Sequence, residues 1–241
     1  MDLLLTAALA EEAAAEATPT WFQTAFVKFG TMPVWQGIVI AVLLLCGIAA
    51  YAFLRGQKRT VWTTKMLSVG AICMALSMVL SMIRLYRMPQ GGSITPASML
   101  PLILFAFLYG PGPGFTLGAL YGVLQALVDA WFASWVQFLL DYPLAYAMMG
   151  IAGFFRVQNH QDPQLMMKLS LGIVIASVAR GVMHLLSGVI FFADYAPAGV
   201  SPWVYSLGYN ASYILPEIVI CIVLAALMGR RLVKEMYRLN Q

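Results

Sequence analysis

The stretch WVQFLLDYPLAYAMMGIAGFF, from Trp135 to Phe155, decides the fold, because it is long and apolar enough to cross a membrane and is interrupted by Asp141 and Tyr142. A carboxylate is costly in hydrocarbon, so it is expected to face a bundle interior or a polar cavity rather than lipid. Asp141 is therefore the first candidate functional residue. The alternative is a carboxylate near the lipid headgroups that bonds to its neighbours and has no other role.

The composition indicates a membrane protein. Of 241 residues, 61% are hydrophobic and 10% are charged, which no ordinary soluble fold shows. The net charge of +4 does not indicate nucleic acid as a partner, because the basic residues cluster beside apolar stretches. The three cysteines lie inside such stretches without paired spacing, so we expect no disulfide, no metal site and no cofactor.

Seven apolar stretches predict an all-α polytopic membrane protein. They cover about residues 34–54, 67–85, 98–109, 115–132, 135–155, 169–192 and 205–228. Proline and glycine in RLYRMPQGGSITP (84–96) predict a loop, and GPGPG (110–114) predicts a tight turn. The apolar run near the start imitates a signal peptide, but no basic residue precedes it.

The basic residues predict the orientation. Ten Lys and Arg residues fall on one face of the predicted membrane and three on the other. Because cytoplasmic loops carry the excess of Lys and Arg, we expect the N-terminus outside and the C-terminus inside, which requires an odd number of spans.

Polar side chains in the last two spans outline two facing walls, because residues three or four apart share a helix face. The sixth span carries one such row, Arg180, His184, Gly188 and Phe192. The seventh contributes Tyr205, Tyr209, Asn210, Tyr213 and Glu217, of which the last three share a face.

The outer members of these rows, with Asp141, predict a pocket open to the outside. A carboxylate, an imidazole, an amide and aromatic faces suit a cationic, partly aromatic ligand. The alternatives are that His184 is a hydrogen-bonded packing residue and that the tyrosines form an interfacial belt, an interpretation strongest for Tyr109 and Tyr121.

Arg180 and Glu217 lie near the middle of their spans, where an isolated charge costs at least about 2.5 kcal/mol. We predict an interhelical ion pair between them, beneath the pocket. The alternative is that Glu217 is protonated or bonded to water, and that Arg180 bonds carbonyl groups or the ligand.

Four segments closely resemble the thiamine-specific substrate-binding components of energy-coupling factor transporters. They are MPQGGSIT (88–95), FLLDYPLAY (138–146), HLLSGVIFF (184–192) and VYSLGYNASYILPE (204–217). The resemblance covers residues 65 to about 232 and implies a six-helix fold, with the vitamin bound near the outer surface under the loop at 84–97. The span at 34–54 lies outside it and would be an extra N-terminal transmembrane helix.

This resemblance divides the expected chain into four parts. They are an acidic extracellular segment (1–33), the extra helix with a basic cytoplasmic linker (34–64), a six-helix substrate-binding domain (65–232) and a cytoplasmic tail (233–241).

The resemblance also implies the site. The acidic pocket residue of the family falls on Asp141, with Tyr142 beside it, and its histidine falls on His184. A glycine-to-aromatic stretch falls on Gly188 to Phe192, and a tyrosine and an asparagine fall on Tyr205 and Asn210. Some relatives have glutamate in place of Asp141 and tryptophan in place of Phe192. In this pocket the carboxylate side chain is therefore about one methylene shorter, and the aromatic stacking face is smaller.

The implied function is high-affinity thiamine capture in the cell membrane, by a subunit that is not itself an enzyme. The implied partners are a transmembrane coupling protein and two ATPase subunits, and the small residues Ala71 and Ala75 match the motif that grips the coupling protein. Two alternatives remain: another cationic vitamin or a thiamine precursor as ligand, or an intramembrane enzyme that uses Asp141 and His184 as an acid–base pair.

Overall fold

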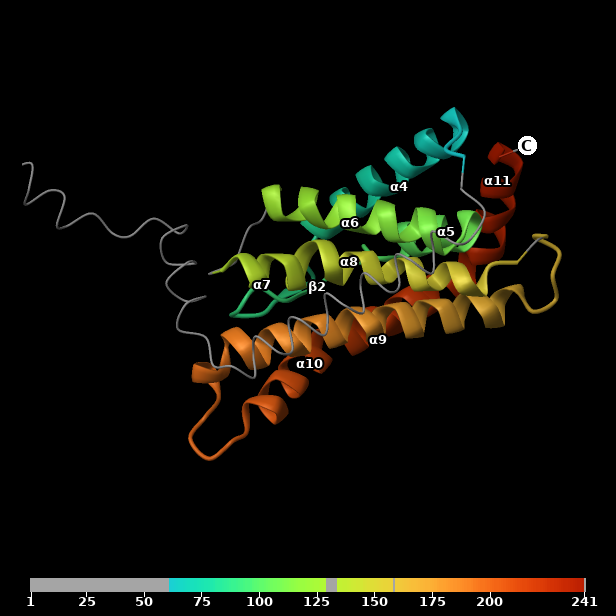
Figure 1. Ribbon diagram of the computed structural model, residues 1–241. Helices are drawn as coiled ribbons and strands as arrows, with labels where there is room; N and C mark the ends of the chain where they lie inside the picture. The colour runs from blue at the N-terminus through green and yellow to red at the C-terminus, as the bar shows by residue number, and fades with distance from the viewer. Residues whose placement is uncertain (1–60, 129–133, 158, 241) are drawn as a thin grey trace, which may run out of the picture.

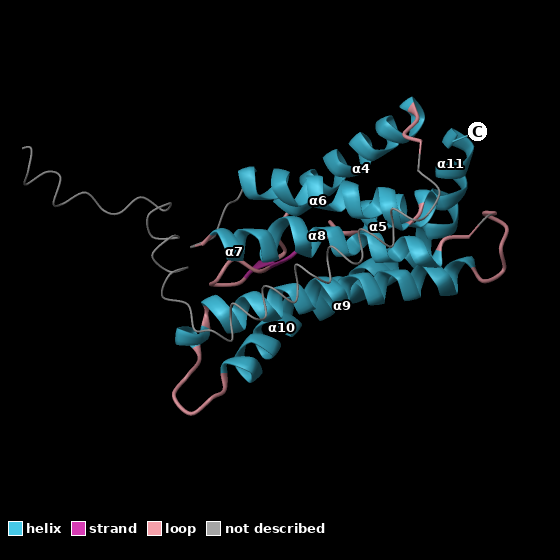
Figure 2. Cartoon of the chain, viewed as in Figure 1, coloured by secondary structure: helices cyan, strands magenta, loops and turns pink. Residues whose placement is uncertain are grey.

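The computed structural model describes residues 61–128, 134–157 and 159–240, and this part of the chain is mainly helical (Figures 1 and 2). The predicted span at 34–54, the segment at 1–33 and most of the linker lie outside the described residues. Within them, four helical stretches are long and apolar enough to cross a membrane, namely 64–82, 135–155, 165–191 and 202–239. The predicted membrane class is therefore confirmed, and the count of seven spans stays a prediction.

The helices run roughly along one direction, side by side (Figure 1). Single helices are α4 (Thr64–Met82), α5 (Leu100–Tyr109), α6 (Pro111–Val128) and α9 (Leu165–Phe191), followed by the short η3 (Ala193–Tyr195). The last apolar stretch consists of α10 (Pro202–Leu224), η4 (Ala225–Gly229) and α11 (Arg230–Asn240). Helix α11 lies at one end of the bundle (Figure 1).

Helix α5 forms the centre of the core. All nine residues from Leu100 to Leu108 are buried, as expected for a helix that is apolar on every side. It packs against α4, α6, α9 and the stretch at 148–155, which surround it.

The stretch from Trp135 to Phe155 is helical throughout but changes its hydrogen-bond register. It consists of α7 (Trp135–Leu139), the π-helix η1 (Leu140–Leu144), α8 (Ala145–Ala147) and the 3-10 helix η2 (Met148–Phe155). Pro143 lies inside the π-helix, and a proline cannot donate the backbone bond that a regular α-helix needs there. The wider turn places Asp141 and Tyr142 at a local distortion of the kind often found at functional sites.

Three glycines of α6, spaced four residues apart, let this distorted stretch approach closely. A Cβ atom on Gly122 would collide with the carbonyl oxygen of Tyr142 and lie 2.9 Å from Cα of Pro143. A Cβ on Gly118 would collide with the carbonyl oxygen of Tyr146, and one on Gly114 would lie 2.9 Å from Cα of Gly150. The site-bearing stretch therefore rests directly on the backbone of α6.

Helix α6 begins earlier than the sequence indicated. The turn predicted over residues 110–114 is reduced to Gly110, whose φ of 94° is a conformation that favours glycine, and the helix starts at Pro111. Proline suits the first helical turn, because its missing N–H would have no partner there.

The loop between α4 and α5 folds into a small antiparallel hairpin, which we call the hairpin loop (residues 84–97). Strands β1 (Tyr86–Arg87) and β2 (Ser93–Ile94) pair directly, and Gly91, with a φ of 95°, completes the turn. The loop predicted from its proline and glycine content is confirmed, and the strand pairing was not predicted. Strand β2 contacts α10, so the hairpin loop lies over the helix that carries Asn210.

Candidate ligand-binding site

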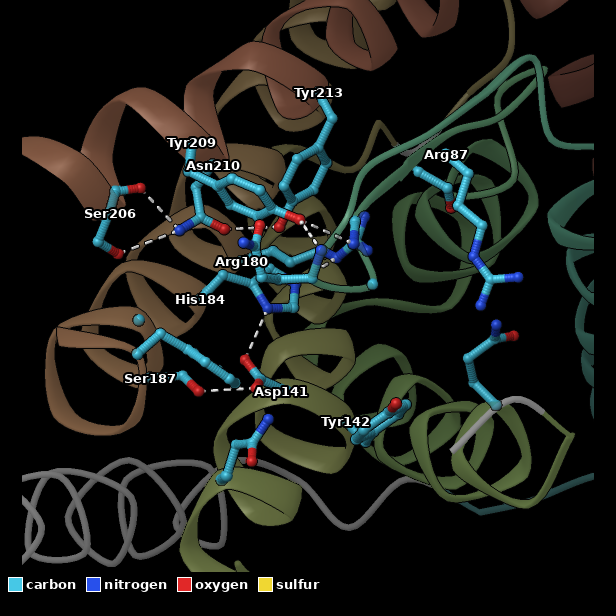
Figure 3. Close-up of a pocket in the computed structure, with 18 of the residues that line it drawn as sticks. Arg87, Asp141, Tyr142, Arg180, His184, Ser187, Ser206, Tyr209, Asn210 and Tyr213 are labelled. Carbon is cyan, nitrogen blue, oxygen red and sulfur yellow. Dashed lines mark hydrogen bonds and ion pairs between the residues drawn. The ribbon is translucent and has the colours of Figure 1, made fainter. Parts of the chain in front are cut away.

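A pocket lies between the hairpin loop, α6, the stretch at 135–155, α9 and α10 (Figure 3). The structure brings together all seven residues expected to bind the ligand, each of which lines this pocket: Asp141, Tyr142, His184, Gly188, Phe192, Tyr205 and Asn210. Residues 90–93 of the hairpin loop, with Arg84 and Arg87, form another part of its wall.

Asp141 is held by two neighbours from α9. Its Oδ1 lies 2.9 Å from Nδ1 of His184, and its Oδ2 accepts a hydrogen bond from the hydroxyl of Ser187 at 2.7 Å. The side chains of Asp141 and His184 are 17% and 12% exposed, so both are largely shielded from solvent. The π-helix and α9 therefore meet through this carboxylate, as Figure 3 shows.

Arg180 lies one turn before His184 on α9 and is buried. Its Nε donates to Nε2 of His184 at 3.2 Å. Because a guanidinium nitrogen carries hydrogen and has no lone pair to offer, Nε2 is the acceptor in this contact. The other ring nitrogen of His184, Nδ1, faces the carboxylate of Asp141.

The predicted contact between Arg180 and Glu217 is present. Nη1 of Arg180 lies 3.5 Å from Oε2 of Glu217, and the two side chains are 10% and 2% exposed. Glu217 does not line the pocket but lies below it. Its Oε1 accepts hydrogen bonds from the hydroxyls of Thr95 and Ser98, where the hairpin loop joins α5.

Helix α10 forms the opposite wall. Asn210 is buried, its amide nitrogen donates to the carbonyl oxygen of Ser206 at 2.8 Å, and its amide oxygen accepts from the hydroxyl of Tyr213 at 2.6 Å. Gly188 of α9 permits the close approach of α10, since a Cβ there would collide with the hydroxyl of Ser206. These contacts fix the orientation of Asn210 without any ligand.

Aromatic rings cover much of the remaining wall. Tyr142 stacks on Phe138 with ring centres 5.9 Å apart, and Tyr205 lies 6.3 Å from Tyr209. The proposed interfacial-belt role is wrong for Tyr121, which is 1% exposed and packs edge-on against Tyr146 in the core. Its hydroxyl donates to Oε1 of Gln125, which lines the pocket.

The hairpin loop is attached to α10 at three levels. Near its tip, the hydroxyl oxygen of Tyr209 accepts from the backbone N–H groups of Gln90 at 3.1 Å and Gly92 at 3.4 Å. Gly92 lies against the ring of Tyr213, and Glu217 holds the base. The residues of α10 at these levels are spaced four apart, so they form one row on the helix.

Ala71 and Ala75 lie elsewhere, on the exposed side of α4. Large apolar side chains around them are also exposed, among them Ile72 at 63% and Val79 at 56%. This face is therefore available to lipid or to a partner helix.

Several pocket and support residues were missed from the sequence: Gln125, Ser187, Thr95 and Ser98. Only Ser187 carried a usable signal, because it follows His184 by three residues and shares its face.

The two carboxylates of the buried cluster have different partners. Glu217 faces the guanidinium of Arg180, whereas Asp141 contacts the imidazole of His184 and the hydroxyl of Ser187. Asp141 is the carboxylate that lines the pocket. Among the described residues, no group of His, Cys, Asp or Glu could hold a metal ion.

The comparisons with known proteins agree with this geometry. Residues 67–236 match the thiamine transporter protein family. The thiamine transporter ThiT of Bacillus subtilis is 35% identical over 167 residues, covering 66% of this chain and 86% of that protein. ThiT of Lacticaseibacillus paracasei is 30% identical over 140 residues, covering 54% and 70% respectively.

A solved structure of ThiT from Listeria monocytogenes has a TM-score of 0.63 and 26% identity, and covers 72% of this chain and 96% of that one. The resemblance of the four motifs is confirmed, and a transport role replaces the enzyme alternative. With its long apolar helices, this chain is a multi-pass membrane protein that belongs to the thiamine transporter protein family.

Proposed function

We propose that this protein captures thiamine in the pocket under the hairpin loop and serves as the substrate-binding component of an energy-coupling factor importer. The observation that carries the first part is the carboxylate of Asp141, which lies at the wall of an aromatic-lined pocket. A carboxylate and aromatic faces both attract a cation such as the thiazolium ring of thiamine. The names of the relatives point to the same ligand.

The direct test is calorimetric titration of the purified protein in detergent. We expect thiamine to bind at one site without turnover. The separate aminopyrimidine and thiazolium halves of thiamine serve as controls, because each offers only part of the complementary surface. Equal affinity for one half would favour a precursor as the ligand, and failure of thiamine to bind would overturn the proposal.

The partnership is the second part of the proposal. It consists of a transmembrane coupling protein and two ATPase subunits, which bind at α4, with Ala71 and Ala75 at the contact. The exposure of both alanines supports it, because small side chains on a lipid-facing helix allow another helix to approach closely. Reconstitution with and without these partners, followed by thiamine uptake, tests it. Uptake without ATP hydrolysis would contradict it.

The predicted arrangement in the membrane belongs to the same proposal. The six-helix domain at 65–232 follows an extra helix at 34–54, with the N-terminus outside and the tail at 233–241 in the cytoplasm. The excess of basic residues on one face supports this orientation. Labelling of single cysteines introduced at residue 20 and at residue 239 tests it, since only the first should react with an impermeant reagent outside intact cells.

A further inference from the structure

The guanidinium group of Arg180 is held in one orientation by contacts at all three of its nitrogens. Nε faces Nε2 of His184 at 3.2 Å, Nη1 faces Glu217 at 3.5 Å and the sulfur of Met99 at 2.8 Å, and Nη2 faces the hydroxyl of Tyr146 at 3.4 Å. The guanidinium carbon also lies 4.7 Å from the ring centre of Tyr146. With all three nitrogens engaged, the Nε–H direction is fixed toward His184.

We infer that Arg180 is a positioning residue for the pocket: it fixes His184 in the Nδ1–H tautomer, and Glu217 holds Arg180 in the orientation that this requires. The tautomer of a histidine is set by the bond that its other nitrogen makes. Here that bond comes from a group that can only donate.

The opposite tautomer would be unfavourable at both nitrogens. A hydrogen on Nε2 would meet the Nε–H of Arg180, and the lone pair of Nδ1 would face the Asp141 oxygen at 2.9 Å. With the Nδ1–H tautomer, His184 and Ser187 each donate to one oxygen of Asp141. Asp141 therefore keeps a fixed position and offers the pocket only acceptor lone pairs.

This arrangement deepens the proposed function and, for its ligand-binding consequence, rests on it. A neutral imidazole does not cancel the charge of Asp141, so a ligand with a positive charge and hydrogen-bond donors is complementary to this carboxylate. A protonated imidazole at the same place would cancel that charge.

Glu217 is suited to hold Arg180, because its two oxygens have separate partners. Oε2 faces Arg180, while Oε1 accepts from Thr95 and Ser98. Between them, Ala97 is buried and has a φ of 62°, a left-handed conformation that alanine rarely adopts. The base of the hairpin loop therefore fixes Glu217, which fixes Arg180.

The chain has two histidines, His160 and His184, which makes a spectroscopic test direct. In the His160→Gln variant, the ¹⁵N NMR signals of labelled histidine come from His184 alone. We expect the ligand-free protein to show a protonated Nδ1 and an unprotonated Nε2. A protonated Nε2 in this parent protein would overturn the inference.

The variants separate positioning from general packing. Arg180→Met removes the donor, and the double variant Arg180→Met/Glu217→Gln serves if the single one does not fold, since it strands no charge. Either should shift His184 toward the Nε2–H tautomer. Gly208→Ala is the control, because a Cβ there meets nothing within 4 Å, and it should leave the tautomer unchanged. An Nδ1–H tautomer that persists without Arg180 would contradict the inference.

Affinity provides the second measurement. We expect the double variant to bind thiamine at least about tenfold more weakly, the scale of one hydrogen bond to a charged group. The resonance test uses the protein without ligand, so a failure of thiamine to bind the parent would overturn the proposed function and leave the tautomer result intact. A changed tautomer with unchanged affinity would overturn the link between Arg180 and binding.

Discussion

At the scale of single residues, Asp141 combines two properties that rarely coexist. Both of its oxygens accept hydrogen bonds from α9, yet its charge is not neutralised by them, because Ser187 and His184 are neutral donors. Its position is thus stabilised while its charge remains available to a ligand.

Replacement of Asp141 by Asn removes the charge with almost no change of shape. We expect the affinity for thiamine to fall at least about tenfold, because a hydrogen bond or contact with a charged group contributes about 1.5 kcal/mol or more. Calorimetric titration measures this. Ser187→Ala, which removes a neutral bond to the same carboxylate, should have a smaller effect, and equal losses in the two variants would show that the charge is unimportant.

Arg180 and Glu217 should be coupled in stability. We expect Arg180→Met and Glu217→Gln each to destabilise the protein by about 3 kcal/mol, since each strands a buried charge. The double variant should recover much of the loss. Thermal unfolding in detergent measures the cycle. Strictly additive losses would mean that the 3.5 Å contact contributes nothing.

Charged residues of the site could be predicted from the sequence, and hydroxyl residues could not. Asp141, Arg180 and Glu217 stand out because a charged side chain in an apolar span is energetically costly and therefore rare. Thr95 and Ser98 occupy a loop where such residues are common, and their role depends on a helix more than a hundred residues away. No local pattern contains that information.

At the scale of elements, the glycines of α6 hold the π-helix in place. Gly122→Ala would put a Cβ against the carbonyl oxygen of Tyr142, and the neighbouring contact is backbone, which cannot rotate away. We expect a loss of about 1–3 kcal/mol in stability, the usual cost of overpacking, together with weaker thiamine binding.

Gly208→Ala is the matched control on α10. A Cβ at Gly208 meets nothing within 4 Å, so this change should be neutral or slightly stabilising, because alanine is the better helix former. Thermal unfolding and titration of both variants test the pair. Wild-type stability in Gly122→Ala would show that α6 and the π-helix can separate without cost.

Long apolar runs predicted where most described helices lie, but not their internal register. Hydropathy does not depend on whether a helix is α, π or 3-10, so the π-turn at 140–144 was not predicted, although Pro143 was its visible cause. The hairpin strands are two residues each, too short for an alternating pattern to be recognised.

At the scale of the whole molecule, the pocket and the exposed alanines of α4 belong to separate surfaces, so binding and uptake should separate as well. We expect Ala71→Leu or Ala75→Leu to leave thiamine affinity unchanged and to abolish uptake, because a large side chain prevents close helix approach. Binding and uptake of labelled thiamine are measured side by side.

Ala71→Ser is the control for that experiment, since serine keeps the small volume and should preserve uptake. Normal uptake in both leucine variants would remove the coupling role of this face. The face itself was suggested by the sequence, whereas the central place of α5 was not, because the order of packing around one apolar helix depends on contacts between distant segments.

The attachment of the hairpin tip to α10 makes the opening of the pocket measurable by amide hydrogen exchange. Tyr209 holds the tip through two main-chain N–H groups, those of Gln90 and Gly92, and an amide bonded in this way exchanges with deuterium only while the bond is broken. The exchange rate at these two amides therefore reports how often the hairpin tip separates from α10 and opens the pocket. Thiamine at a concentration a hundred times its dissociation constant should lower this exchange rate about a hundredfold, because only the closed form retains the ligand. Tyr209→Phe, which removes the acceptor, should let both amides exchange freely while the amides within α5 keep their protection.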